Sequence, residues 1–402
     1  MDRDATQRNR DEAVSGEAED GRPVDFSPYK GPAGGWGSAK SLKHILAHEE
    51  VPLTGPRVLA KQNKPDGLMC TSCAWPRPAD HHPFEFCENG AKATAWEITP
   101  KRCDAAFFAR HTVSELLTWS DYALEAEGRL TEPMRYDAET DRYVPVDWET
   151  AFAEIGAELA RIRERDPKRT VFYASGRASL ETSYMWALLA RAYGNNNLPD
   201  SANMCHETTG VALKPVIGAT VGTVLMEDFK ETDCLLFFGQ NPGSNSPRML
   251  HDLRSARKRG AQIITFNPLK ERGLERFTSP QNPLEMATGT ETQISTHYYQ
   301  VRAGGDIAAI LGMAKWLLEE DAIDHAFIAE HTDGLEEFRA LAKETSWPEI
   351  EATSGLSRFD LETAAAAYAR SEKAIGIYGM GLTQHVGAVE NVQMVINLLL
   401  LR

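Results

Sequence analysis

The sequence of 402 residues has no apolar run long enough to cross a membrane as a helix. Such a span needs about 18 apolar residues, and the longest candidate, Val395–Leu401, is far shorter. The N-terminus also lacks the apolar centre of a secretory signal or a twin-arginine leader, since it reads MDRDATQRNRDEAVSGEAEDGRP. These absences predict a cytoplasmic protein without membrane insertion.

Positive charge is scarce as well. The 43 lysine and arginine residues face 58 aspartate and glutamate residues, which gives a formal net charge of −15. An acidic chain is repelled by nucleic acid phosphates and by anionic membrane surfaces. The composition therefore predicts neither nucleic acid nor a membrane as a partner.

Several common catalytic signatures are missing. The glycine-rich stretch GPAGGWGSAKS at 31–41 lacks the ending of a Walker loop, and no Gly-x-Ser-x-Gly nucleophile elbow occurs. A zinc-protease helix of the His-Glu-x-x-His type is excluded because Gly210 stands where the second histidine belongs. Gly379-x-Gly381 lacks the third glycine of a dinucleotide fingerprint, so a plain NAD site is not expected.

What remains is the composition of an ordinary soluble globular protein, 42% hydrophobic and 25% charged, with room for two or three domains. The parts that we expect are a disordered tail at 1–30, a loop-rich metal module at 31–105, the first segment of a second α/β domain at 106–170, and a dinucleotide-type α/β domain at 171–402. The chain stops in an uncapped apolar helix, NLLLLR, which predicts a fragment without its C-terminal half.

From residue 171 onward, short apolar runs alternate with helical periodicity. The predicted strands are Val171–Ala174, Cys234–Phe238, Ala261–Phe266 and Ala374–Tyr378. A helix is predicted before this part, at Trp148–Glu164. The predicted helices within it are Ser179–Tyr193, Pro247–Arg259, Asp306–Glu319, Phe359–Arg370 and one from about Ala388. This alternation predicts an α/β fold with a doubly wound parallel sheet covered on both faces. Ligands of such sheets bind beyond the carboxyl ends of the strands, where turns occur at 175–177, 239–243, 267–268 and 379–384.

Four of the six cysteines cluster between positions 70 and 103. An isolated cysteine in an apolar run, such as Cys234, is expected to be a small buried hydrophobic residue. Cys70-x-x-Cys73 followed by Cys87 has the spacing of metal ligands, and it suits either an iron–sulfur cluster or a zinc site. The fourth ligand stays open. Its candidates are Cys103, His81 and His82.

A second candidate site begins at Cys205-His206, upstream of the apolar run 234–238 and its glycine-rich turn. A soft thiolate near such a turn suits a large anionic cofactor with a metal at one end. The backbone amides of 239–245 are suited to a pyrophosphate, because glycine lets the chain approach closely. Asp306, at a helix start, is either an N-cap or an acceptor for a guanine edge. A cysteine–histidine protease is the alternative for Cys205-His206, but the glycine-rich stretch that follows does not favour it.

Together these stretches resemble the molybdopterin oxidoreductases, specifically the branch similar to formate dehydrogenase alpha subunits. The stretches that carry the resemblance are AGGWG (33–37), CTSCAWP (70–76), FCENGAKATAWE (86–97), NNNLPDSANMCHE (195–207), GQNPGSNSPRML (239–250), NPLKERGLERFTSPQNP (267–283) and YGMGLTQH (378–385). The resemblance implies an N-terminal iron–sulfur module and Rossmann-like domains of the DMSO reductase and formate dehydrogenase type (domains I–III). It also implies two cofactors, namely one iron–sulfur cluster, expected as 4Fe-4S, and molybdenum bis(molybdopterin guanine dinucleotide).

The resemblance further assigns roles to single residues. Cys205 matches the molybdenum ligand and His206 the neighbouring proton acceptor, while Cys70, Cys73 and Cys87 match cluster ligands. The residues expected around the pterin dinucleotide are Gly176, Gly239, Asn241, Pro242, Asn267, Asp306 and Gln384.

Three positions depart from the family pattern. Arg77 stands where the family has another cluster cysteine. Cys87-Glu88-Asn89-Gly90 replaces the frequent Cys-x-Lys-Gly, which leaves Lys92 as the nearby lysine. Gln393 occupies the catalytic position at which formate dehydrogenases carry an arginine, and an amide anchors a carboxylate less firmly than a guanidinium does.

The resemblance therefore predicts a molybdenum oxidoreductase that oxidises or reduces a small substrate by two electrons. Electrons would leave through the cluster to an electron-carrier protein or redox subunit. The alternative is a truncated or degenerate binding module that holds only zinc or an iron–sulfur cluster.

Overall fold

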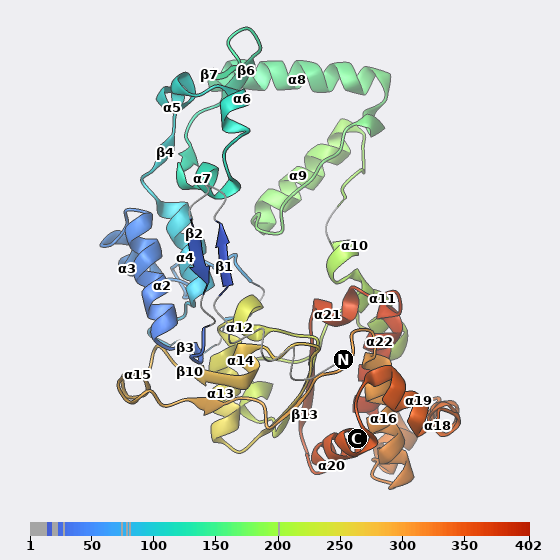
Figure 1. Ribbon diagram of the computed structural model, residues 1–402. Helices are drawn as coiled ribbons and strands as arrows, with labels where there is room; N and C mark the ends of the chain where they lie inside the picture. The colour runs from blue at the N-terminus through green and yellow to red at the C-terminus, as the bar shows by residue number, and fades with distance from the viewer. Residues whose placement is uncertain are drawn as a thin grey trace.

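The computed structural model describes residues 14–17, 23–26, 29–73, 75–77, 79, 82–199 and 202–402 (Figure 1). A four-stranded sheet organises the C-terminal half. Its strands are β8 (Cys234–Phe238), β9 (Gln262–Phe266), β12 (His297–Tyr299) and β13 (Ala374–Tyr378). They lie in the order β12-β9-β8-β13, and all neighbours are parallel. The predicted parallel sheet is therefore confirmed.

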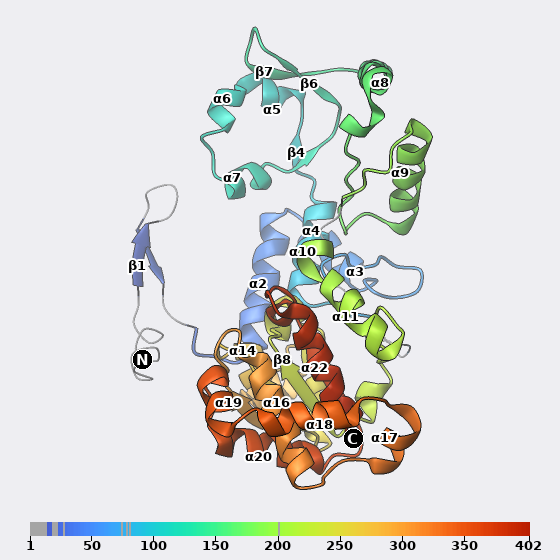
Figure 2. The same ribbon diagram turned by 90° about the vertical axis from the view of Figure 1, so that its right-hand side faces the viewer.

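Both faces of this sheet are covered, because successive side chains of a strand point in opposite directions. Leu236 and Phe238 of β8 enter one hydrophobic core, whereas Leu235 and Phe237 enter another. The helices that cover the sheet are α13 (Met249–Lys258) on one face, and α16 (Asp306–Glu319), α20 (Arg358–Ala369) and α22 (Ala388–Leu400) on the other. Figure 2 shows α16 and α22 in front of β8. This double cover accounts for the fully buried apolar run of β8.

One predicted strand is wrong. Residues 171–174 are irregular, and the backbone N–H of Phe172 donates to the carbonyl of Asn197 over 3.0 Å instead of joining a sheet. Phe172 packs against Tyr193 in a small separate core, while Val171 is exposed. A single buried side chain in this run is too little to fix it between two strands. Conversely, β12 has no predicted counterpart, since His297-Tyr298-Tyr299 is not an aliphatic run.

The cysteine-containing module is more helical than the sequence predicts. It contains α2 (Gly35–His48), α3 (Thr54–Leu59) and α4 (Glu88–Ile98), which share one hydrophobic core. The preceding strand β3 (Ala33–Gly34) pairs in parallel with β10 (Arg276–Thr278), and β10 pairs with β11 (Thr292–Gln293). This small sheet joins the module to the C-terminal half of the chain.

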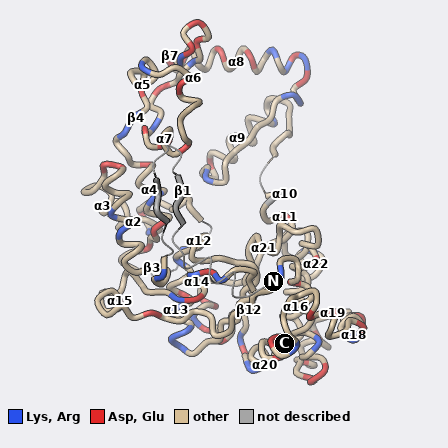
Figure 3. Tube along the Cα trace, in the orientation of Figure 1, with Lys and Arg blue, Asp and Glu red and all other residues tan. Residues whose placement is uncertain are grey.

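Residues 102–199 form a region at one end of the molecule, away from the four-stranded sheet (Figures 1 and 2). Its elements are β4 (Arg102–Cys103), α5 (Ala105–Arg110), α6 (Val113–Leu116), α7 (Asp121–Ala126), β5 (Arg129–Leu130), β6 (Met134–Asp137), β7 (Arg142–Pro145), α8 (Trp148–Arg165), the 3-10 helix η1 (Pro167–Arg169) and α9 (Leu180–Tyr193). Acidic and basic residues are interspersed along α8 (Figure 3). The predicted helices at 148–164 and 179–193 are confirmed by α8 and α9.

The remaining elements lie between the strands and helices named above or pack against them. They are α10 (Ala202–Cys205), α11 (Glu207–Ile217), η2 (Asp228–Lys230), α12 (Pro242–Asn245), α14 (Arg272–Glu275), α15 (Pro283–Thr288), α17 (His325–His331), α18 (Leu335–Glu344), α19 (Trp347–Ser354) and α21 (Met380–Thr383). In the described part of the chain, every helix is too short or too polar to cross a membrane.

The tail at 1–30 was expected to be disordered, and the structure differs at two short strands. There β1 (Val14–Glu17) pairs antiparallel with β2 (Pro23–Phe26). The rest of this segment up to residue 28 lies outside the described residues, so the expectation is not tested there.

Candidate functional site

The order of the strands reverses at one point of the sheet, between β8 and β13. From β8 the chain adds β9 and β12 on one side and then returns to add β13 on the other. Ligands of open parallel sheets bind at such a reversal, beyond the carboxyl ends of the two strands that flank it, which here are β8 and β13. The turns after β8 and β13 begin at Gly239 and Gly379, so both glycine-rich turns of the sequence lie there.

These two turns touch through their backbones. The N–H of Gly381 donates to the carbonyl of Gly239 over 3.3 Å. A Cβ atom on Gly381 would lie 2.5 Å from that carbonyl oxygen, and Gly239 itself has a φ of 55°. Glycine is therefore required for this close approach. The exposed backbone next to it is the kind of surface that a phosphate can reach.

The predicted residues after β8 and β9 are held beside this contact. Asn241 accepts a hydrogen bond from the N–H of Ser244 as the cap of α12, in which Pro242 is the first residue. The Asn241 amide also donates to a carboxylate oxygen of Glu271 over 2.8 Å. The Asn267 amide donates to the carbonyl of Gln240 over 3.3 Å. The structure thus brings together the turns that contain four predicted residues, Gly239, Asn241, Pro242 and Asn267.

Cys205 reaches the same edge of the sheet from a different part of the chain. The Thr383 hydroxyl donates to the carbonyl of Cys205 over 2.7 Å, and the Cys205 thiol lies 3.2 Å from the sulfur of Met380. The Tyr378 hydroxyl donates to Thr209 over 3.1 Å and fixes the start of α11 to β13. These contacts hold the Cys205 thiol at the carboxyl end of β13.

His206, Gln384 and Gln393 come from elements around this thiol. His206 is exposed and stands at the N-terminus of α11, where its side chain makes no capping bond. The Gln384 amide lies 3.8 Å from the sulfur of Met380, the neighbour of the Cys205 thiol. Gln393 is half-buried on α22, which packs against α11 through Val392.

Asp306 is not a helix cap, which corrects one of the two interpretations of this residue. The N-cap of α16 is Gly305, and it has no side-chain capping bond. The Asp306 carboxyl group is only 4% exposed, and burial raises its pKa while the charge of His385 lowers it. His385 directly follows Gln384, so a buried carboxyl group faces the turn that carries a predicted cofactor residue.

Gly176 is the predicted cofactor residue that the structure leaves apart. It lies in an exposed turn before α9, and no atom of the described residues stands within 4 Å of the place that its Cβ would occupy. The reason is that residues 171–174 do not form a strand of the four-stranded sheet, so the turn that follows them is not carried to the edge of that sheet.

The three cysteines of the spaced motif line one cavity of about 190 Å³. Backbone N–H groups of Ser72 and Gly90 donate to the sulfurs of Cys70 and Cys87, each over 3.4 Å. Burial raises the pKa of the Cys87 thiol to about 11, against the lowering effect of the Gly90 N–H. In the described part of the chain, no three His, Cys, Asp or Glu side chains are grouped so as to hold one metal ion.

The two candidates for a fourth ligand that the structure describes, Cys103 and His82, do not line this cavity. Cys103 packs against Phe107 and Phe108 in another core. The His82 ring accepts the N–H of Phe84 over 3.1 Å and lines a neighbouring cavity instead. His81 lies outside the described residues.

Contacts near the cysteine cavity connect the cysteine module to the sheet domain. The Asn89 amide, at the position of the family lysine, donates to the carbonyl of Ser244 over 2.7 Å. Arg248, which sequence reasoning missed, lines the cysteine cavity and pairs with Glu85 over 3.0 Å. Lys92 does not take over the lysine position, since it pairs with Glu88 on its own helix over 2.9 Å. A cavity of about 820 Å³ lies between the two parts, bordered by Cys87 and Asn89 on one side and by the turn at 241–244 on the other.

Comparison with known proteins now decides the family. The family model "Molybdopterin oxidoreductase" matches residues 129–402. The chain belongs to the molybdopterin oxidoreductase family. This agrees with the resemblance carried by the sequence stretches around Cys205 and Gly239.

Among relatives of this molybdopterin oxidoreductase chain is Protein YdeP of Escherichia coli K12. It is 48% identical over 384 residues, which are 93% of this chain and 50% of that protein. Formate dehydrogenase H of the same organism is 28% identical over 277 residues, 68% of this chain and 36% of that protein. The chain thus spans about half the length of the YdeP proteins that it matches.

A solved structure is similar in fold. Acetylene hydratase from Pelobacter acetylenicus superposes with a TM-score of 0.53 at 20% identity, over 65% of this chain and 33% of that one. At this identity the likeness concerns the fold alone.

The residues at the sheet edge of this molybdopterin oxidoreductase chain fit a pterin cofactor. The contact between Gly239 and Gly381 has no room for a side chain, and the thiol of Cys205 lies next to it in the turn of Met380. Asp306 supplies a buried acceptor. A soft ligand, a backbone contact without room for side chains and a buried polar acceptor are the kinds of groups that such a cofactor requires.

Proposed function

We propose that this chain carries the cofactor sites of a molybdenum oxidoreductase that oxidises or reduces a small substrate by two electrons. The observation that carries the proposal is the position of Cys205. Its thiol is held at the carboxyl end of β13, beside the strand-order reversal where ligands of parallel sheets bind.

Different residues of the chain would bind different parts of a molybdenum bis(molybdopterin guanine dinucleotide). Cys205 would be the thiolate ligand of the metal. The turn at 239–242 and Asn267 would hold phosphates through backbone and amide donors, and Asp306 with Gln384 would hold the guanine end. When bound, the cofactor supplies the two-electron chemistry of its metal.

His206 would move the proton that accompanies the electrons. It directly follows Cys205, and its exposed side chain is in reach of solvent. A histidine exchanges protons near neutral pH because its ordinary pKa is about 6.5.

An iron–sulfur cluster is the group proposed for Cys70, Cys73 and Cys87. Three thiolates around one zinc ion lie at most about 4.6 Å apart, since each Zn–S bond is about 2.3 Å. These thiols line one cavity without grouping around a single ion, which favours a larger cluster over zinc. Backbone N–H donors to sulfur and the Arg248 guanidinium suit the negative charge of such a cluster.

Electrons would pass from the cluster to an electron-carrier protein or redox subunit in the cytoplasm. The Asn89–Ser244 hydrogen bond ties the cysteine module directly to the glycine-rich turn, so the two proposed cofactor sites are neighbours. Gln393 makes formate a poorly held substrate, because a neutral amide cannot pair with a carboxylate as a guanidinium does.

The test is metal analysis and dye-linked turnover of the protein expressed from its complete gene and purified without oxygen. We expect molybdenum and iron in the wild type, and we expect Cys205→Ala to lose turnover while it keeps its iron. Cys103→Ala is the matched control, since Cys103 lies outside the cysteine cavity, and it should keep both metals and turnover. Zinc as the only metal, or full activity of Cys205→Ala, would contradict the proposal.

A further inference from the structure

The cysteine cavity contains one polar group that the proposed metal ligands do not explain. Gln62 is fully buried, and its amide nitrogen has no hydrogen-bond partner among the residues that the structure describes. Leaving such a donor unpaired carries a desolvation penalty, so a buried amide without a partner is uncommon in native proteins. Gln62 lines the same cavity as the three cysteines.

The direction of the amide follows from its neighbours. Thr94 of α4 donates its hydroxyl to the Gln62 carbonyl oxygen over 3.3 Å, so the nitrogen points towards Gly90, one turn earlier on the same helix. A Cβ on Gly90 would lie 2.7 Å from the Gln62 nitrogen and 3.0 Å from the Cys70 sulfur. Both atoms therefore border the same side of Gly90. The reversed amide would place its carbonyl oxygen towards that sulfur, where two acceptors would face each other.

We propose that the Gln62 amide donates a hydrogen bond to sulfur of the iron–sulfur cluster and thereby sets its reduction potential. This inference rests on the proposed cluster at Cys70, Cys73 and Cys87. An N–H donor stabilises the reduced cluster more than the oxidised one, because the reduced cluster carries one more negative charge. Hydrogen bonds to the sulfurs are one of the determinants of such potentials. Gln62 is thus a positioning and tuning residue, not a ligand of the metal.

The experiment is a redox titration of the anaerobically purified holoprotein, followed by electron paramagnetic resonance of the reduced cluster. We expect Gln62→Leu to keep its iron and to have a lower potential than the wild type. A lost hydrogen bond to a charged group changes the reduced-to-oxidised ratio by about tenfold, which is 59 mV for a one-electron couple. Thr94→Val keeps the amide but removes the contact that orients it, and we expect a smaller change in the same direction.

Gln281→Leu is the matched control. It makes the same chemical change at a glutamine whose amide donates to the carbonyl of Phe84 over 2.8 Å, outside the cysteine cavity. Its cluster should titrate like that of the wild type.

The outcomes separate this inference from the proposed function. Wild-type protein without iron, or with zinc alone, overturns both. Wild-type protein with iron whose potential is unchanged in Gln62→Leu overturns the role of Gln62 only. If Gln62→Leu does not retain iron, Thr94→Val decides: a lower potential supports the inference, and an unchanged one overturns it.

Discussion

At the scale of single residues, our proposal gives position 393 a part in the choice of substrate. Gln393 is half-buried on α22, beside the helix that starts after Cys205. We predict that Gln393→Arg lowers the KM for formate about tenfold in a dye-linked assay, because a charge-assisted bidentate pair replaces a neutral contact. Gln393→Met, of similar size and without charge, is the control. Equal formate kinetics for the two variants would show that this residue does not face the substrate.

Residues of the site were predictable to different degrees. Cys205 and Gly239 are recognisable because a soft ligand and a glycine-rich strand end are local patterns. Gln62, Arg248 and Thr383 were not predictable, since each acquires its role only where it meets a distant segment, such as Thr383 at the Cys205 carbonyl. Gly176 is a wrong prediction from a local pattern, because the expected strand before its turn, at 171–174, does not form.

At the scale of elements, the contact between the two turns at the sheet edge determines the geometry of the site. A side chain on Gly381 would collide with the backbone of Gly239, which cannot move without shifting β8. We predict that Gly381→Ala lowers stability by about 1–3 kcal/mol and reduces molybdenum content. Gly222→Ala is the control because nothing lies within 4 Å of its Cβ position, and thermal unfolding should barely change. Equal melting of both variants would contradict this contact.

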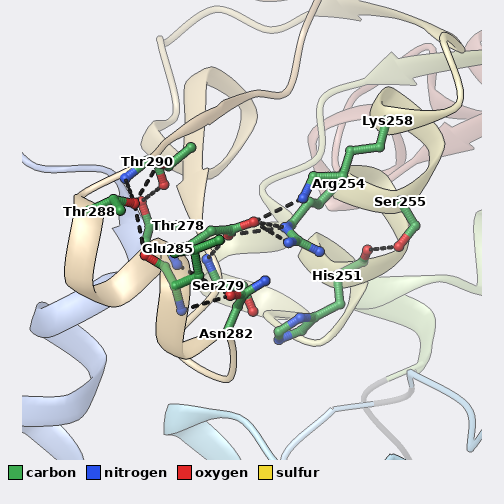
Figure 4. A network of polar contacts seen from close by, with 11 residues as sticks. His251, Arg254, Ser255, Lys258, Thr278, Ser279, Asn282, Glu285, Thr288 and Thr290 are labelled. Atoms are coloured by element: carbon green, nitrogen blue, oxygen red, sulfur yellow. Dashed lines mark hydrogen bonds and ion pairs between the residues drawn. The ribbon is translucent and has the colours of Figure 1, made fainter.

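A second element-scale feature is the ion-pair network between α13 and α15 (Figure 4). The buried carboxylate of Glu285 accepts hydrogen bonds from Arg254, from Lys258 over 2.9 Å, and from the N–H of Ser279 over 3.1 Å. Burial alone would raise the pKa of Glu285, but these donors outweigh burial and lower the pKa from 4.5 to about 2. The network joins the segment at 279–285, which leads into α15, to α13 on one face of the sheet.

The lowered pKa of Glu285 fixes the sign of a pH effect. The Glu285 carboxylate stabilises the fold fully above about pH 4.5, which is the pKa of this group in the unfolded chain. The stabilisation is lost as the pH falls towards 2, the pKa in the folded protein. We predict that Glu285→Gln is less stable than the wild type by about 3 kcal/mol at pH 7, and that the difference shrinks at low pH. Thermal unfolding at pH 7, 5 and 3 measures it. An equally large difference at pH 3 would exclude titration of Glu285 as the cause.

At the scale of the whole molecule, the alternation of strands and helices predicted the layered sheet but not its strand order. Periodicity identifies β8, β9 and β13, whereas their order depends on which strands pair, and β12 is a polar aromatic run without a local signal. The helices of the cysteine module were missed for a related reason. Prolines and cysteines concentrate in the sequence between residues 70 and 87, and they concealed the helical segments α2 to α4 on either side.

The region at 102–199 leaves part of an amphipathic helix in contact with water. On α8, Phe152 and Ile155 are 65% and 57% exposed, although they belong to the same apolar stripe as Leu159. Leu159 packs against the small core around Phe172. The stripe therefore has a covered end and an uncovered end, and exposed apolar patches of this kind promote association.

The two ends of the stripe give a matched pair of variants. We predict that Ile155→Glu leaves the thermal unfolding of this 402-residue chain within about 0.5 kcal/mol of the wild type and reduces its self-association in sedimentation velocity. Leu159→Glu, one turn further along, buries a charge against the core and should lower the melting temperature clearly. If Ile155→Glu destabilises the chain as much as Leu159→Glu does, Ile155 is covered by another part of the same chain. Both variants place one glutamate on the same helix and change the net charge equally. Leucine and isoleucine differ in helix propensity by only about a few tenths of a kcal/mol, so burial dominates the comparison.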